Sequence, residues 1–514
     1  LAMATMLSLL TSLAVIGGAW WVWTVVRWVW LRPRAIERCL RKQGLNGPSY
    51  RLLHGDTNQI ATMARQTINS KPLSFSDDFL PIVLPIFKEL EITSMKARRL
   101  CLQESILVIS ESNQETGHLI EPNSKGLVIG KISFTWLGPT ARISIMDPEL
   151  IKEVLVNNKI YKKPTPNPMV KLMHMFSAMY TSCNDILITE WAKLVSESGW
   201  CELDVQPYID DFSSDVISRN AFGSSYEQGR RIYQLQKEQA MLTSQVLKSP
   251  YLPGRRFLPT KTNRRMKEIN NELRSILSKV MEKKAANPDD DLLSLLLQST
   301  KITNGDMGMS VDEAIAECKA FYFAGQESSS NLLVWTMILL SQHQTWQAKA
   351  REDVHRVFKH NKPSYEGLSQ LKVVTMILYE VLRLYSPATI FTRITYKETK
   401  LGDLTLPAGV ELLLPVIFVH HDCELWGEDA KEFNPERFSE GIAKATKNKL
   451  AFFPFSWGPR ICIGNNFALM EAKLAISTIL QNFSFELSPS YTHSPSYVVT
   501  LQPKHGAHLI LRKI

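Results

Sequence analysis

The chain has 514 residues, of which 45% are hydrophobic and 21% are charged, as is usual for folded globular proteins. This composition excludes a disordered, collagen-like or coiled-coil chain, and only seven cysteines exclude a disulfide scaffold. The net charge of +9 suits an acidic partner or an anionic membrane surface, and we expect no nucleic-acid binding.

The amino-terminal residues 1–31 form an apolar segment whose only charged residue is Arg27. About 20 helical residues cross the hydrocarbon core of a bilayer, so this segment is long enough. Its carboxyl half is rich in tryptophan, and five basic residues follow it closely: Arg32, Arg34, Arg38, Arg41 and Lys42. A cleaved secretory signal is the alternative, but the segment lacks a basic start and a small-residue cleavage site. We therefore expect one transmembrane helix over residues 1–31 and one large cytosolic domain over residues 32–514.

Helical patterns dominate the large domain. Ser310 and Glu313 form a capping box that opens a long helix running to about Gln342. Short alternating segments predict strands at residues 132–136, 141–145 and 508–511. The sequence therefore predicts a mainly α fold with small β-sheets.

A loop near the carboxyl end contains Phe455, Gly458, Arg460, Cys462 and Gly464, and a helical pattern follows it. A thiol at a helix start lies near the positive end of the helix dipole, which stabilises a thiolate. Such a thiolate can be an axial ligand of haem iron. The glycines would then admit backbone close to the flat macrocycle, with Arg460 on a haem propionate and Phe455 near the sulfur. The alternative is a buried structural cysteine in a turn.

The spacing Phe-x-x-Gly-x-Arg-x-Cys-x-Gly resembles the haem-binding signature of the cytochrome P450 family, and the chain matches every fixed position. The resemblance implies the cytochrome P450 fold, haem b (iron protoporphyrin IX) with Cys462 as axial iron ligand, and haem-thiolate monooxygenase activity. From about residue 201 to 514 the chain looks like a plant microsomal member, of the clan that includes secologanin synthase and triterpenoid oxidases.

This resemblance also implies a setting for the enzyme. It indicates the endoplasmic reticulum membrane, a hydrophobic, terpenoid-like substrate, and a domain at residues 32–514 that carries the haem-thiolate chemistry. The chain has no GxGxxG or Walker A loop for a nucleotide of its own. Electrons from NADPH are therefore expected to arrive through NADPH–cytochrome P450 reductase.

Glu380 and Arg383 lie three residues apart in a helical pattern, which puts both on one helix face. A surface ion pair worth a few tenths of a kcal/mol is one interpretation. The pair is also similar to the Glu-x-x-Arg of the family, which implies a buried triad completed by Arg437 behind the cysteine loop. Arg393 lies where family members often carry a propionate-binding arginine, and an ordinary exposed arginine is the open alternative.

Within the long helix, the segment Ala324, Gly325, Glu327 and Ser328 resembles the oxygen-binding motif Ala-Gly-x-(Asp/Glu)-Thr-Thr of the family. Glycine in a helix interior costs about 1 kcal/mol relative to alanine, so it needs a reason. A close helix crossing and a gap for dioxygen are both possible reasons. Glu327 and Ser328 are expected to deliver protons as general acids. Ser328 replaces the usual threonine, which puts the coupling efficiency in doubt.

Two regions depart from the family pattern. Residues 88–128 look like an insertion, and a deletion is expected near residues 168–183. The family normally has a Trp-x-x-x-Arg helix there that contacts a haem propionate, and this part of the chain lacks one. Trp191, the next tryptophan, is followed four residues later by Val195. The chain is therefore expected to hold haem weakly.

Three functions remain open from the sequence. The first is a membrane-anchored haem-thiolate monooxygenase with Glu327 and Ser328 as catalytic residues. The second is a haem-thiolate isomerase or dehydratase, which has no need of proton delivery to dioxygen. The third is a non-catalytic or haem-deficient family member, which the missing Trp-x-x-x-Arg helix favours. The substrate and the regiochemistry cannot be predicted.

Overall fold

The structure of the protein is a computed structural model. It describes residues 15–45, 47–51, 73–75, 78–84, 132–137, 140–157, 161–162, 175–195, 198–223, 226–247, 258–286, 292–300, 309–447 and 450–514. The predicted insertion at residues 88–128 lies outside the described residues, and so do residues 1–14 of the predicted anchor and residues 168–174 of the predicted deletion.

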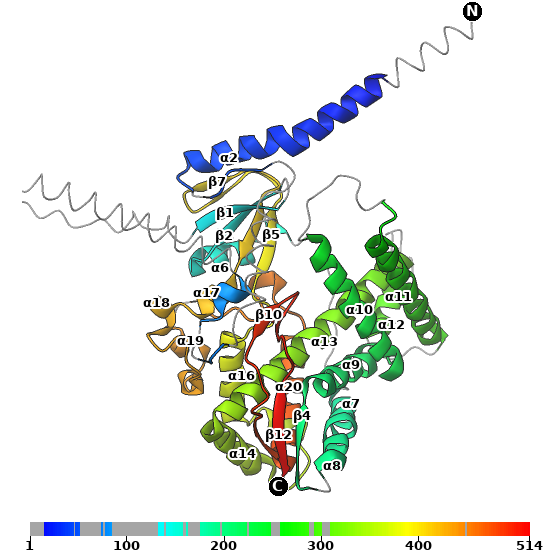
Figure 1. Ribbon diagram of the computed structural model, residues 1–514, viewed down its shortest axis with the longest axis vertical. Coiled ribbons are helices and arrows are strands. Elements are labelled where there is room, and N and C mark those ends of the chain that lie inside the picture. The colour runs from blue at the N-terminus through cyan, green and yellow to red at the C-terminus, as the bar shows by residue number, and fades with distance from the viewer. Residues whose placement is uncertain are drawn as a thin grey trace, which may run out of the picture.

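A continuous helical run at the amino end projects from the body of the molecule (Figure 1). It consists of residues 15–26, a π-helical turn η1 (Arg27–Leu31) and α2 (Arg32–Lys42). Pro33 accounts for the wide turn, because proline has no N–H to donate to the carbonyl of Val29. The Tyr50 hydroxyl donates to this carbonyl instead, at 2.6 Å.

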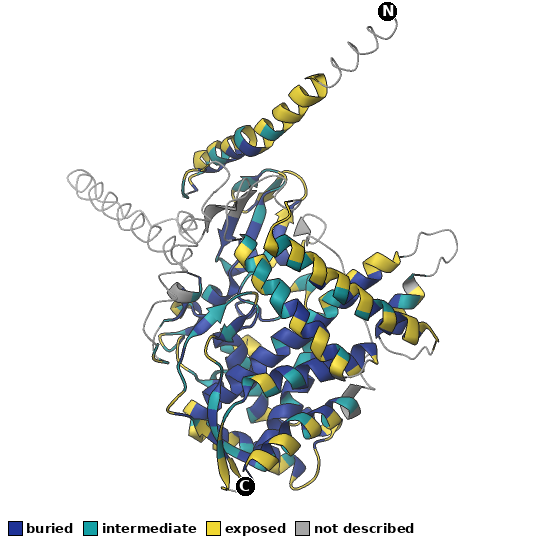
Figure 2. Ribbon diagram, turned by 45° about the vertical axis from the view of Figure 1, so that its right-hand side comes forward, coloured by how far each residue is buried: buried dark blue, intermediate teal, exposed yellow. Residues whose placement is uncertain are grey.

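The inner end of this helical run is fixed to the domain. The Gln43 amide exchanges two hydrogen bonds with the backbone of Thr405, at 3.0 and 2.6 Å. Arg32 donates to the carbonyl oxygen of Ala408 at 3.1 Å. The outer part is largely exposed (Figure 2). None of the helices in the described part of the chain has the length and apolar character needed to cross a membrane.

The long helix α13 (Val311–Gln342) runs through the middle of the molecule (Figure 1). It opens with the predicted capping box, in which the Ser310 hydroxyl and the Glu313 carboxylate each accept a backbone N–H of the other residue. Its second half is buried on all sides, as expected of a helix enclosed by others. The helices in contact with it include α9 (Gln206–Phe222), α10 (Tyr226–Leu247), α11 (Lys261–Ala286), α12 (Leu292–Ser299), α14 (Gln344–Phe358), α16 (Lys372–Leu384) and α20 (Asn465–Asn482).

Shorter helices connect these long ones. Their bounds are α4 (Leu80–Val83), α6 (Pro148–Val156), α7 (Met175–Ser182), η3 (Cys183–Thr189), α8 (Glu190–Val195), α15 (Tyr365–Leu368), α17 (Val416–His420), α18 (Cys423–Trp426), η5 (Pro435–Phe438), α19 (Ile442–Ala445) and η6 (Gly458–Arg460).

The sheets are small, and the predicted strands are confirmed. A five-stranded sheet has the order β1 (Ile132–Leu137), β2 (Thr140–Ile145), β8 (Glu411–Leu414), β5 (Phe391–Thr395) and β3 (Tyr161–Lys162). Only its β2–β8 pair is parallel. The other sheets are β4 (Trp200–Asp204), β12 (His508–Lys513) and β9 (Phe483–Leu487), then β6 (Thr399–Leu401) with β7 (Leu404–Leu406), and β10 (Pro495–Tyr497) with β11 (Leu501–Pro503).

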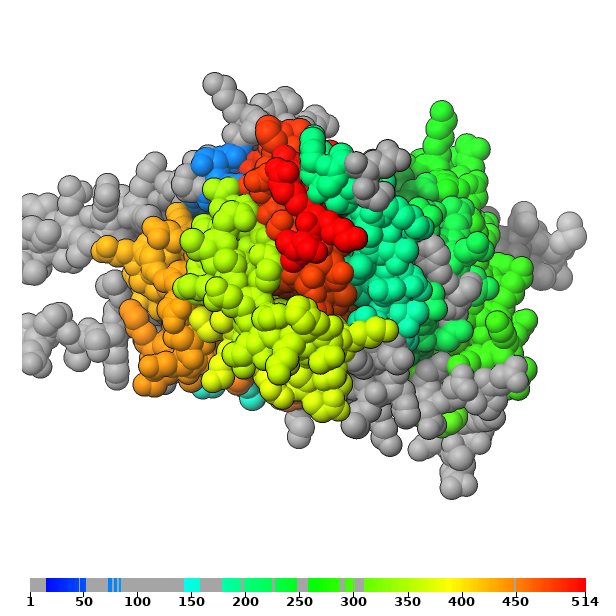
Figure 3. Space-filling model, turned by 90° about the horizontal axis from the view of Figure 1, so that it is seen from below, coloured from blue at the N-terminus to red at the C-terminus, as the bar shows by residue number. Residues whose placement is uncertain are grey.

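The carboxyl-terminal strand β12 joins distant parts of the chain. It pairs antiparallel with β4 on one side and with β9 on the other. Seen from below, the carboxyl end lies at the surface between the green segments that follow α8 and the yellow-green helices around α14 (Figure 3).

Taken together, these elements make a fold that is mainly α with small β-sheets, as predicted.

Candidate functional site

The cysteine loop is a tight turn that only certain residues can form. Ser456 and Gly458 both have positive φ angles, of 65° and 74°. A Cβ atom on Gly458 would lie 2.7 Å from the carbonyl oxygen of Leu155 on α6, so a larger residue would displace the loop. The Cys462 N–H donates to the Phe455 carbonyl at 2.8 Å and closes the loop. Cys462 is exposed, which excludes the alternative of a buried structural cysteine.

The cysteine lies just before a helix, as the sequence predicts. Helix α20 begins at Asn465 with Gly464 as its N-cap residue. The Cys462 sulfur lies 3.9 Å from the position that a Cβ atom on Gly464 would take, so glycine keeps the space beside the sulfur open. An exposed thiol at a helix start is chemically suited to bind a metal as the thiolate.

Two arginines at this loop influence each other electrostatically. Arg393 on β5 is only 2% exposed, which excludes the alternative of an ordinary exposed arginine. Its Nη1 donates to the carbonyl of Thr392 at 2.8 Å, while its buried Nη2 has no hydrogen-bond partner. Burial and the nearby charge of Arg460 lower the pKa of Arg393 to about 10. A buried donor and a second cation beside it fit a ligand that carries negative charge.

The structure brings Glu380, Arg383 and Arg437 together in the interior. Arg383 makes a bidentate pair with Glu380, with both N–O distances at 2.7 Å. Arg437 lies 3.4 Å from the same carboxylate, and the two α16 side chains are 0% exposed. The surface ion pair is therefore excluded as an interpretation. Arg437 also pairs with Asp429 at 2.8 Å, a partner that sequence reasoning missed.

His420, which sequence reasoning also missed, connects this triad to the cysteine loop. Arg383 Nη1 donates to the His420 carbonyl at 2.7 Å, and the Phe453 N–H donates to His420 Nε2 at 2.9 Å. Phe453 lies two residues before Phe455, so the contacts reach the start of the loop. Burial and nearby positive groups hold the pKa of His420 well below its usual value, which keeps the ring neutral as an acceptor.

We expect Glu380→Ala to lower the free energy of unfolding by about 3–5 kcal/mol, because it leaves a buried guanidinium without its carboxylate. Glu190→Ala is the matched control. Glu190 pairs with Lys193 at the same i,i+3 spacing and at 2.6 Å, but on the surface, so its loss should change stability little. Denaturant unfolding measures both variants, and equal losses would contradict a special role for the buried triad.

The predicted oxygen-binding segment of α13 contacts several elements. A Cβ atom on Gly325 would lie 2.6 Å from Ile217 on α9, so the structure shows the close helix crossing that explains a glycine here. Ala324 is exposed, and the Ser328 hydroxyl donates to its carbonyl at 2.7 Å. Glu327 turns elsewhere and accepts from Tyr233 at 3.1 Å and from Thr500 at 2.8 Å.

A cavity of about 300 Å³ lies beside this segment. Phe323 on α13 and Val498 and Val499 at the turn of the β10–β11 hairpin give it apolar walls. Helix α10 adds small and polar side chains, namely Gln236, Gln239, Ala240, Thr243 and Ser244. Such a cavity suits an amphipathic organic molecule.

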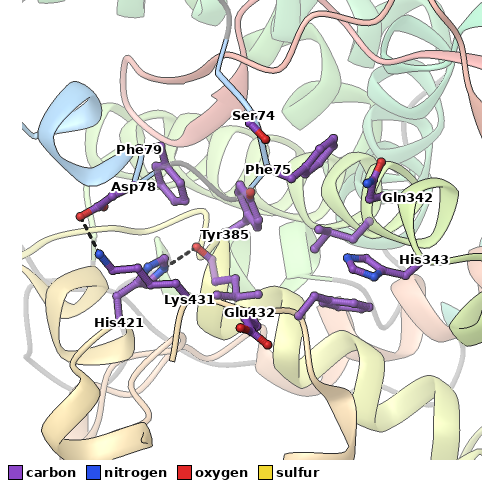
Figure 4. A pocket seen from close by; sticks show the side chains of 13 residues that line it. Ser74, Phe75, Asp78, Phe79, Gln342, His343, Tyr385, His421, Lys431 and Glu432 are labelled. Atoms are coloured by element: carbon purple, nitrogen blue, oxygen red, sulfur yellow. Dashed lines mark hydrogen bonds and ion pairs between the residues drawn. The ribbon is translucent and has the colours of Figure 1, made fainter. Parts of the chain in front are cut away.

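A second cavity, of about 410 Å³, has aromatic walls that include Phe79 and Tyr385 (Figure 4). An ion pair between Asp78 and Lys431, at 2.9 Å, lies at its edge. None of the predicted site residues lines this cavity. It is therefore separate from the cysteine loop and from the α13 segment.

The described residues 175–195, which include the end of the predicted deletion, form α7, η3 and α8. Trp191 on α8 is fully buried and packs against Tyr208 and Phe483, so it is a core residue. The Trp-x-x-x-Arg spacing does occur in the amino-terminal helix, at Trp23 and Arg27, at Trp28 and Arg32, and at Trp30 and Arg34. In the last pair the Arg34 guanidinium lies 3.8 Å from the centre of the Trp30 ring, so it is already engaged there.

Comparison with known proteins identifies similar chains. The family model described as Cytochrome P450 matches residues 169–510. Cytochrome P450 CYP72A219 of Panax ginseng is 48% identical over 533 residues, covering 96% of each chain. Cytochrome P450 72A397 of Kalopanax septemlobus is 48% identical, and 7-deoxyloganic acid hydroxylase of Catharanthus roseus is 43% identical, again over 96% of each chain.

The chain belongs to the cytochrome P450 family. As a member it is a plant-type monooxygenase with haem iron as its cofactor. The site fits a thiolate-bound porphyrin with two anionic propionates. Its exposed thiol is Cys462, and its two neighbouring cations are Arg393 and Arg460.

Proposed function

We propose that the protein is a membrane-anchored haem-thiolate monooxygenase that oxidises a hydrophobic small molecule with electrons from NADPH–cytochrome P450 reductase. The cysteine loop carries this proposal, because it combines an exposed thiol at a helix start with a buried, unpartnered arginine donor nearby. The carbon monoxide difference spectrum of the reduced protein tests it, since a thiolate ligand shifts the main absorption band to longer wavelength.

Five residues of the loop, together with Arg393 of β5, would hold the cofactor. Cys462 would bind the iron, Arg393 and Arg460 the propionates, and Phe455 would pack near the sulfur, with Gly458 and Gly464 leaving room for the ring. Ala324 would face the opposite side of the ring, whereas Gly325 lets α9 pack closely against α13 beside it. When bound, haem supplies dioxygen activation, which a thiolate ligand favours by donating electron density.

The residues of the chain itself would handle the protons. Glu327 is held by Tyr233 and Thr500, which fixes its carboxyl group between α10 and the β10–β11 hairpin. The Ser328 hydroxyl donates to a backbone carbonyl and can rotate to pass a proton on. Glu380, Arg383 and Arg437 would position the loop behind the cofactor through His420 and Phe453.

The cavity between α10, α13 and the β10–β11 hairpin would hold the substrate. Its apolar walls with nearby amide and hydroxyl groups suit a terpenoid-like molecule that carries a few polar groups. The similarity to 7-deoxyloganic acid hydroxylase supports this class of substrate. The exposed tryptophans of the amino-terminal helix support a location at the endoplasmic reticulum membrane with residues 1–31 as anchor.

A haem-deficient family member is the second candidate, because the chain lacks the Trp-x-x-x-Arg helix after Pro168. Haem content after purification separates it from both enzyme functions. An isomerase or dehydratase is the remaining alternative, and the Glu327 and Ser328 pair argues against it. Dependence of turnover on the reductase separates it from the monooxygenase.

Ser328→Ala is expected to keep haem and substrate binding but to release more hydrogen peroxide per NADPH consumed, because the proton route loses its hydroxyl. Ser328→Thr restores the usual residue and should couple as well as the parent or better. Peroxide and product are measured against NADPH in the reconstituted system. Unchanged coupling in Ser328→Ala would show that this hydroxyl delivers no proton.

A further inference from the structure

Two buried carboxyl groups share one phenol where α9, α10 and α13 meet. The Tyr233 hydroxyl lies 3.1 Å from Glu327 Oε2 and 3.4 Å from Asp210 Oδ2. These three residues are only 7–8% exposed. A hydroxyl carries one proton and can donate to one carboxylate at a time, so this proton has two alternative acceptors.

The row of polar groups continues to the surface. Lys237, whose side chain is 39% exposed, lies 3.1 Å from the same Asp210 oxygen that faces Tyr233. At the inner end, Glu327 is the residue next to Ser328 in α13. The donor–acceptor distances from Lys237 through Asp210 and Tyr233 to Glu327 are all 3.4 Å or less. The groups therefore connect solvent with the segment assigned above to proton delivery.

The hydrogen bonds of the two carboxylates show that Asp210 has other donors on both of its oxygens, whereas Tyr233 is the donor to Glu327 Oε2. Asp210 already accepts from Ser330 through one oxygen and from Lys237 through the other. Glu327 accepts from Thr500 through Oε1, and Asn331 donates to its main-chain carbonyl at 2.8 Å. Burial and the two nearby carboxylates raise the pKa of Tyr233, so the phenol stays protonated. A protonated hydroxyl can give its proton to one neighbour while its oxygen accepts a proton from the other.

We propose that Asp210 and Tyr233 form a proton relay from the surface to Glu327. A proton passes from the Lys237 ammonium to Asp210, from Asp210 to the Tyr233 oxygen, and the original phenol proton passes to Glu327 Oε2. Each transfer breaks one bond to hydrogen and forms one, and Lys237 then regains a proton from water. Asp210 and Tyr233 act through Glu327 and are positioning residues. This inference rests on the proposed role of Glu327.

Tyr233→Phe and Asp210→Asn test the relay, because each keeps the side-chain shape. Tyr233→Phe removes the hydroxyl proton, and Asp210→Asn removes the carboxylate that accepts a proton and passes it on. Tyr208→Phe on α9 is the control, since it removes a phenol from the same region outside the relay. In the reconstituted system we expect product per NADPH to fall about tenfold in the two relay variants, below the roughly 10²-fold effect of a direct acid. The unfolding midpoint and the carbon monoxide spectrum should match those of Tyr208→Phe.

A second measurement needs no haem. The infrared spectrum of the purified full chain is recorded at acidic pH, where protonated carboxyl groups absorb. The band that is lost in Glu327→Gln is assigned to the Glu327 carboxyl group. After mixing with heavy water, this band shifts as the Glu327 carboxyl exchanges its proton for deuterium. The exchange should be about tenfold slower in Tyr233→Phe than in Tyr208→Phe, because the phenol can no longer transfer a proton directly. A purely structural contact would leave this exchange rate unchanged.

The outcomes separate the two proposals. If Glu327→Gln couples as well as the parent, the proposed role of Glu327 is wrong. If Glu327→Gln uncouples while Tyr233→Phe and Asp210→Asn behave like Tyr208→Phe in both measurements, the relay is wrong and the proposed function stands.

Discussion

Cys462→Ala is expected to abolish the long-wavelength carbon monoxide band of the reduced protein. That band requires a thiolate ligand, and within the described residues Cys462 is the cysteine carried by the loop before α20. The substitution leaves the φ angles of Ser456 and Gly458 unaffected, so the loop itself should form. The expected effect is complete loss of the band, measured in a carbon monoxide difference spectrum.

Cys423→Ala is the matched control for this experiment. Cys423 is also an exposed cysteine, but it begins the short helix α18. Its replacement should leave the band at the same wavelength and height per haem. A Cys462→Ala protein that kept the band would show that another residue binds the iron.

The unaltered chain is expected to purify largely as apoprotein. Haem propionates are anions, and a buried charge without a partner costs several kcal/mol. Arg393 and Arg460 can serve as donors, but the donor of the Trp-x-x-x-Arg helix is missing after Pro168. The missing helix would also cover apolar surface of the pocket, worth about 25 cal/mol per Å². Haem per polypeptide, measured after purification, tests this.

Three altered chains identify the cause of weak binding. One carries a family-like Trp-x-x-x-Arg helix after Pro168, one lacks residues 88–128, and one carries both changes. The chain with both changes should recover haem, and the helix alone should contribute the propionate donor. Full haem occupancy in the unaltered chain would show that another segment has taken over this task.

Features that depend on short spacing could be predicted from the sequence. The capping box at Ser310 and Glu313 and the pairing of Glu380 with Arg383 each lie within one helical turn. Local geometry fixes such contacts before any tertiary structure is known. The cysteine loop could be predicted equally well, because Gly458, Cys462 and Gly464 stand at fixed positions in one short segment.

Contacts between distant segments could not be predicted in this way. Tyr233 and Thr500 meet Glu327 across 94 and 173 residues of chain, and no local pattern links them. The same holds for His420, whose ring meets the backbone of Phe453 33 residues away. Gly325 could not be interpreted for a different reason. A close helix crossing and a gap for a ligand both require a small residue, and only the position of Ile217 in the structure distinguishes them.

The helical run from residue 15 to residue 42 also determines how the domain can be presented to a surface. A flexible tether would let the domain turn freely, but here the helix continues without a break through the π turn. Tyr50 and Gln43 fasten its inner end to the domain. The helical run therefore connects rigidly to the domain. Whatever surface holds the exposed tryptophans also fixes the tilt of the domain, and with it the height of the cavity entrance above that surface.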